Sequence, residues 1–145
     1  MKKKTQIQFL CFKLGEYFFG LDVMNVEEIV NFKGAEIPPI VGGEGFIKYK
    51  DRQLKIYYPD EILLNGPIAA SVDYRLIVVE SERRQIGLVV DSAEEIIRVT
   101  ADEIREVEIA GTDVRRDNLY GQIVQERKIV RLIDLAKMIS AITVH

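Results

Sequence analysis

The sequence predicts a mainly β protein, in which two similar five-stranded β-barrel subdomains share a hydrophobic core and a short helix ends the chain. Short apolar and aromatic runs alternate with turn residues, a pattern typical of β-hairpins. The chain also contains an internal duplication. Apolar residues make up 48% of its 145 residues, which is enough for a full core at this length.

Four β-hairpins are expected, each made of two apolar runs joined by a short polar or charged turn: residues 7–21, 46–58, 76–91 and 120–133. The apolar residues of 22–30 fit a helical turn or a bent strand equally well. Residues 34–45 are rich in proline and glycine and are expected to form a loop.

Two places carry helix-start signals. Thr100 and Glu103 have capping-box spacing, which predicts a single helical turn. Asp134 can cap a C-terminal helix that runs to about Ile142. Four apolar residues would lie on one face of that helix: Leu135, Met138, Ile139 and Ile142.

The duplication joins two sets of segments. Residues 20–30 recur as 87–97, and residues 45–47 and 54–58 recur as 121–123 and 130–134. We therefore expect a single domain over residues 1–145 with two approximate halves, a first barrel at 15–70 and a second at 71–145. An exchange of terminal strands between the halves is left open. Closure of each half into a barrel would remove exposed strand edges.

Composition excludes several classes of protein. Twenty basic against 23 acidic residues give a net charge of −3, which argues against a general nucleic-acid binder. Cys11 is the only cysteine and is expected to be buried, and the only histidine is His145. Zinc sites and a Ser-His-Asp triad are therefore not expected, nor is a phosphate-binding loop. We expect no enzymatic activity, cofactor or metal. No stretch is long and apolar enough for a signal peptide or a membrane span, which predicts a cytoplasmic protein.

Three stretches in order resemble the CheW-like domain, the coupling domain of chemotaxis. Residues 9–15 and 20–29 are similar to its opening, 74–79 and 86–96 to its middle, and 119–123 and 129–135 to its end. The resemblance implies two five-stranded SH3-like barrels around a common core. It also implies an adaptor that binds the regulatory domain of a CheA-type histidine kinase and the cytoplasmic tip of a chemoreceptor.

The resemblance also assigns candidate site residues. Glu28 matches an acidic residue that pairs with an arginine near the receptor surface, and Lys50 stands at that arginine position. Val26 and Ile29 flank Glu28 and are candidates for the receptor groove, while Gly45 matches a glycine of the kinase-facing surface. The first-half hairpin departs from the family pattern, because residues 48–51 read Lys-Tyr-Lys-Asp instead of Asn-Leu-Arg-Gly.

A second interpretation is a nucleic-acid-binding small barrel. Cations and aromatic residues interleave along residues 48–58, as they do on surfaces that stack bases. The acidic total weighs against this interpretation.

Overall fold

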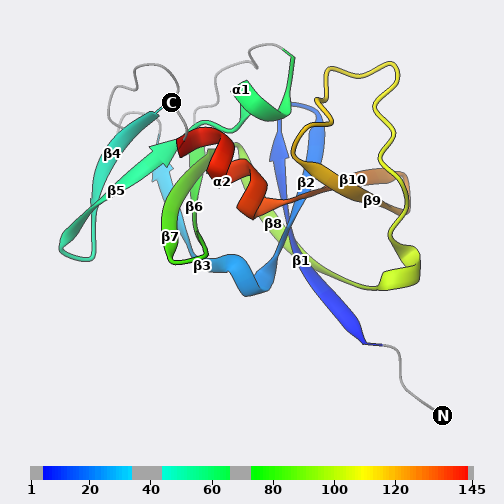
Figure 1. Cartoon of the computed structure of the whole chain (residues 1–145), viewed down its shortest axis with the longest axis horizontal. Helices are drawn as coiled ribbons and strands as arrows, with labels where there is room; N and C mark the ends of the chain where they lie inside the picture. The colour runs from blue at the N-terminus through cyan, green and yellow to red at the C-terminus, as the bar shows by residue number, and fades with distance from the viewer. Residues whose placement is uncertain (1–4, 34–43, 66–72, 144–145) are drawn as a thin grey trace.

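The computed structural model describes residues 5–33, 44–65 and 73–143, and its strands form two five-stranded sheets (Figure 1). Sheet A has the order β8-β1-β2-β10-β9, with bounds Ser92–Thr100, Gln6–Leu14, Tyr17–Asp22, Lys128–Ile133 and Leu119–Gln125. Sheet B has the order β3-β6-β7-β5-β4, with bounds Val26–Lys33, Asp73–Ser81, Arg84–Val90, Arg52–Tyr57 and Glu44–Tyr49. The predicted mainly β fold is confirmed.

The two sheets do not coincide with halves of the chain. Strand β2 lies before residue 70 but belongs to sheet A with β8, β9 and β10, while β6 and β7 belong to sheet B with β3, β4 and β5. The approximate halves 15–70 and 71–145 therefore do not each form one sheet, because strands are exchanged between them. The first repeat (β1–β5) contributes β1 and β2 to sheet A and β3, β4 and β5 to sheet B. The second repeat (β6–β10) contributes β6 and β7 to sheet B and β8, β9 and β10 to sheet A.

The connections explain this exchange. A single residue, Asp91, separates β7 from β8, and a three-residue 3-10 helix, Val23–Asn25, separates β2 from β3. Neither connection turns its two strands into a hairpin, so the chain passes at both points from one sheet to the other. Residues 22–30 thus form a short helical turn followed by a strand.

The strand register confirms the duplication. Strand β10 runs parallel to β2 with Leu132 beside Gly20, and β5 runs parallel to β7 with Ile56 beside Gly87. The sequence repeat relates the same two pairs of residues. Substituting β1–β5 by β6–β10, and the reverse, also converts the order of sheet A into that of sheet B.

Side-chain and backbone contacts bring the edges of each sheet together. In sheet B the Tyr49 hydroxyl, at the end of β4, donates a hydrogen bond to Glu27 Oε2 of β3 over 3.0 Å. In sheet A, Arg105 follows β8 and a 3-10 helix, Ala101–Glu103, and it bridges to Gln122 of β9. Each sheet therefore closes on itself as a small barrel, here called barrel A and barrel B.

Alternate residues of single strands serve different cores, as the two-residue period of a strand requires. In β1, Phe9 and Cys11 lie inside barrel A, while Leu10, Phe12 and Leu14 belong to a core shared by both sheets. Strand β6 divides in the same way, with Leu76 and Val78 inside barrel B and Ile77 and Val79 in the shared core.

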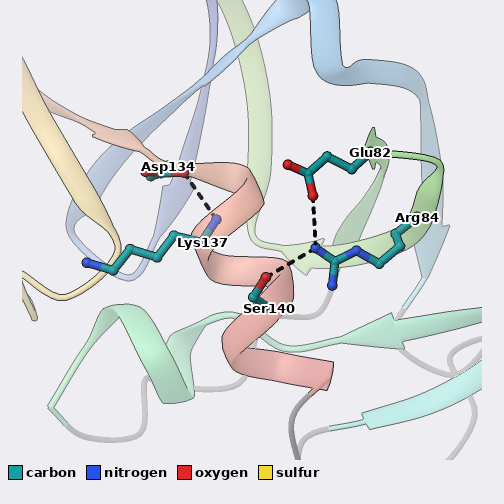
Figure 2. Close-up of polar contacts among 5 residues, drawn as sticks. All are labelled: Glu82, Arg84, Asp134, Lys137 and Ser140. Carbon is teal, nitrogen blue, oxygen red and sulfur yellow. Dashed lines mark hydrogen bonds and ion pairs between the residues drawn. The ribbon is translucent and has the colours of Figure 1, made fainter.

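Helix α2 (Leu135–Thr143) covers the shared core with the apolar face that the sequence predicts. Its first turn is capped by Asp134, whose Oδ1 accepts from the Lys137 backbone N–H at 3.1 Å. Arg84 Nη2 lies 3.1 Å from Ser140 Oγ and 3.5 Å from Glu82 Oε2, which joins the β6–β7 turn to this helix (Figure 2). A short helix α1 (Asp60–Leu63) also contributes to the shared core. No helix in the described residues could cross a membrane.

Candidate interaction surface

Strand β3 carries three of the predicted site residues and lies at an edge of sheet B. A β-bulge falls between Val26, opposite Val79, and Glu28, opposite Val78. The bulge adds Glu27 to the strand without a cross-strand partner and changes which side chains face outward. Glu28 is exposed and Ile29 is 40% exposed, whereas Val26 is half-buried against the shared core.

Lys50 lies in the two-residue turn between β4 and β5. Its φ is 45° and that of Asp51 is 64°, values that match the tight hairpin turns whose twist suits a β-hairpin. Its ammonium nitrogen lies 5.3 Å from the centroid of the Tyr49 ring. Among the described residues no ion pair joins Lys50 to Glu28, so the expected pair is not formed. The turn places the lysine over its neighbour's ring, and the Tyr49 hydroxyl faces the carboxylates instead.

A hydrogen-bond network, here called the Gln85 network, occupies the position of the expected ion pair. Glu27 Oε2 accepts from the Tyr49 hydroxyl at 3.0 Å and from Gln85 Nε2 at 2.6 Å, and Gln85 Oε1 accepts from Arg52 Nη2. Burial raises the pKa of Tyr49, and hydrogen bonds to Glu27 and then Glu28 raise it further. The hydroxyl therefore remains protonated and serves as a donor.

The corresponding position of barrel A is built from different side chains. The repeat relates Glu28 to Glu95, and Glu95 forms an ion pair with Lys128, the repeat partner of Arg52. The hydrogen bond to Glu95 raises the pKa of Lys128. The same ammonium lies 4.8 Å from the centroid of Phe18, which the repeat relates to Gln85. The duplication thus indicates Arg52 as a further cation of this site, a signal that the motif comparison missed.

Large apolar side chains are exposed on both barrels: Met24 (86%), Phe46 (57%), Ile96 (52%), Tyr120 (51%), Val124 (47%) and Ile29 (40%). Met24 and Ile29 lie on either side of Glu28 in the chain. Phe46 follows the half-buried Gly45 on β4, the other edge strand of sheet B. A hollow of about 310 Å³ beside it is lined by Phe46, Ile47, Lys48, Asp51, Arg52 and Gln53.

The nucleic-acid interpretation of residues 48–58 is not supported by this hairpin. Tyr49 and Tyr57 are each only 7% exposed, and Tyr58 is half-buried with its ring edge-on to Tyr74 at 6.1 Å. Bases need exposed ring faces on which to stack. The tyrosines of this hairpin instead fill the interior or pack on one another, which the interleaved sequence pattern did not predict.

The family model of the CheW-like domain matches residues 8–143 of this chain. The chain belongs to the CheW-like family. This is a family of chemotaxis scaffold and adaptor proteins, and the match extends through both barrels. In the described residues, no group of three or more His, Cys, Asp or Glu side chains could hold a metal ion.

Similar proteins agree with this assignment. The chemotaxis protein CheW of Klebsiella aerogenes is 25% identical over 138 residues, 92% of this chain and 82% of that protein. The chemotaxis protein CheW of Treponema pallidum is 21% identical over 142 residues, 94% and 84% of the two chains. The crystal structure of the scaffolding protein TtCheW from Thermoanaerobacter tengcongensis has the same fold, with a TM-score of 0.73, 24% identity and 89% of each chain covered.

Proposed function

We propose that this chain is a non-enzymatic adaptor that couples chemoreceptors to a CheA-type histidine kinase. The observation that carries the proposal is the family match over residues 8–143, through both barrels. The adaptor would bind the regulatory domain of the kinase and the cytoplasmic tip of the receptor.

The receptor-facing surface is proposed to lie along β3 and the β4–β5 turn. Glu28, Ile29 and Lys50 are exposed there, with Met24 nearby in the chain and Val26 half-buried beneath. Exposed apolar side chains beside a carboxylate suit an amphipathic receptor helix, which buries apolar anchors and pairs its polar groups at the rim.

The kinase-facing surface is proposed to include Gly45. This glycine lies on edge strand β4 opposite Ile56, next to the exposed ring of Phe46. An exposed aromatic beside a shallow hollow is a typical anchor for a protein partner.

Charge reversal tests the receptor-facing surface. We expect Glu28→Lys to weaken binding to a receptor tip about tenfold, because it places a cation where a carboxylate would meet the partner. The melting temperature should stay within about 2 °C of wild type, since Glu28 is exposed. Glu16→Lys makes the same change at an exposed position of the β1–β2 turn and serves as the control.

Isothermal titration calorimetry measures the affinity of each variant for the receptor tip and for the regulatory domain of a co-encoded kinase. Full receptor affinity in Glu28→Lys would remove β3 from the receptor surface. Failure of the wild-type chain to bind either partner would refute the proposed function itself.

A further inference from the structure

The tip of the β4–β5 hairpin has little backbone support from the rest of barrel B. The hairpin extends from the body of the molecule (Figure 1). Among the residues that the structure describes, β4 pairs only with β5, and β5 pairs with β7 only at Ile56 and Tyr57, near the base of the hairpin. The tip, from Tyr49 to Arg52, is therefore joined to the barrel by side chains.

The Gln85 network makes that connection from both sides of the hairpin. Tyr49, the last residue of β4, donates to Glu27 of β3, and Arg52, the first residue of β5, donates to Gln85 of β7. Gln85 donates in turn to Glu27 over 2.6 Å, which completes a chain of contacts across four strands. The backbone pairing leaves the tip unsupported at the place where the network is formed.

Gln85 occupies the central position because its amide both donates and accepts. The Oε1 atom accepts from Arg52 and the Nε2 atom donates to Glu27. A glutamate would keep the first contact but would place a second carboxylate against Glu27. A leucine of similar size would lose both contacts.

We propose that Gln85 is a positioning residue that holds the β4–β5 tip against β3, so that Lys50 and Glu28 present one surface to a partner. This inference rests on the proposed adaptor function. Gln85 comes from the second repeat, whereas the residues it positions come from the first, so the strand exchange makes the arrangement possible. The two hydrogen bonds that Gln85 makes are exposed, so their loss should alter the tip more than the stability of the whole molecule.

Hydrogen exchange of the full-length chain tests the positioning directly. In Gln85→Leu and Gln85→Glu, amide exchange at the β4–β5 tip should quicken about fivefold, as expected for the loss of roughly one hydrogen bond. Exchange of the β9–β10 hairpin should not change. Gln125→Leu, at a half-buried glutamine beside the β9–β10 turn, makes the matched change in barrel A and should leave the β4–β5 tip unaffected.

A double variant that swaps the two residues should restore the network. Glu27→Gln combined with Gln85→Glu reverses the direction of the hydrogen bond between positions 27 and 85 while the contact to Arg52 remains. The amide hydrogen-exchange rate at the β4–β5 tip of this double variant should return to within about twofold of the wild-type rate. Unchanged exchange in the single variants, or no recovery in the double variant, would overturn the proposal.

Binding measurements distinguish a failure of this inference from a failure of the proposed adaptor function. Where wild type binds a receptor tip or kinase regulatory domain, Gln85→Glu should bind about fivefold more weakly and the double variant should regain affinity. Equal affinities of wild type and Gln85→Glu would overturn a role in binding. If wild type binds neither partner, the adaptor function fails and the exchange measurements alone decide whether Gln85 positions the hairpin.

Discussion

Gly20 and Gly87 each lie in one of the two parallel strand pairs, Gly20 beside Leu132 and Gly87 beside Ile56. A Cβ atom on Gly87 would lie 2.7 Å from Leu76 Cδ1 and 3.1 Å from Ile56 Cγ2, and one on Gly20 would lie 2.9 Å from Leu132 Cδ2. These distances explain why glycine recurs in the sequence repeat. At both positions the interior of a barrel has no room for a side chain.

Gly87→Ala is therefore expected to destabilise the protein by about 1–3 kcal/mol, the usual cost of adding a methyl group to a packed core. Urea unfolding followed by circular dichroism would measure the change. The slope of the transition should stay as in wild type, because the same surface is exposed on unfolding. An unchanged midpoint would show that Leu76 and Ile56 move aside at little cost.

Asp60 is a second residue whose burial has a measurable consequence. Its Oδ1 atom is buried with no hydrogen-bond partner among the described residues. Burial raises the pKa of this carboxyl above its ordinary value of 3.8, and the charge of Glu61 raises it further, while backbone N–H groups oppose the shift. The folded protein thus takes up this proton more readily than the unfolded chain does.

The sign of the pH effect follows from that shift. Above the folded pKa of Asp60 the folded state bears the full cost of the buried charge, and the cost disappears as the pH falls toward 3.8. Asp60→Asn should therefore be more stable than wild type at pH 7, and this advantage should shrink toward pH 4. Thermal melts of both proteins across this range measure the difference, and an advantage that grows on acidification would contradict the assignment.

At the scale of elements, local sequence signals predict the strands and turns well. Three hairpins turn through two-residue connections in which non-glycine residues adopt positive φ: Lys50 and Asp51, Glu82 and Arg83, and Glu126. Charged residues between two apolar runs predict such turns because the signal lies within a few residues. The capping box at 100–103 is confirmed as well, since the Thr100 backbone N–H donates to Glu103 Oε2.

The start of α2 gives a prediction at this scale. Asp134→Ala removes the acceptor for the Lys137 N–H and should lower the free energy of unfolding by about 1 kcal/mol. Asp113→Ala changes the same residue type at an exposed loop position and should have little effect. Equal midpoints of the two variants in thermal unfolding would show that the cap contributes nothing measurable.

The candidate site was predictable only in part, for a physical reason. A charged residue such as Glu28 was predictable as exposed, but successive strand residues point to opposite faces, so the exposure of Ile29 depends on β3 being an edge strand with a bulge. The Gln85 network joins residues that are 22 to 58 positions apart in the chain, and the contact depends on how the sheets close. Hydrophobic periodicity carries no information about how the sheets close. The position of the Lys50 side chain over Tyr49 was not predictable either, because it depends on the geometry of the β4–β5 turn.

At the scale of the whole molecule, reciprocal strand exchange makes the two barrels interdependent. Neither barrel can form from one repeat, because each needs two strands from one repeat and three from the other. The large shared core, with Phe19 and Leu21 from β2 beside Ile77 and Val79 from β6, also requires both repeats. The hairpin patterns of the sequence could not show this, because a strand that leaves a hairpin can continue into either sheet.

Fragments test this interdependence. Residues 1–68 and 69–145, each prepared alone, should give circular dichroism spectra of unfolded chains, and an equimolar mixture should recover β structure and a cooperative thermal transition. The reason is that every sheet draws strands from both fragments. A cooperative transition in either fragment alone would contradict the interdependence that the reciprocal strand exchange implies.

The most direct test of the adaptor function is whether one molecule of this chain binds both partners at once. Sedimentation velocity would compare the chain mixed with a receptor tip, with the regulatory domain of a CheA-type kinase, and with both. We predict a ternary complex that sediments faster than either binary complex. Two binary complexes that exclude one another, or no complex with either partner, would contradict the proposal that the chain is an adaptor.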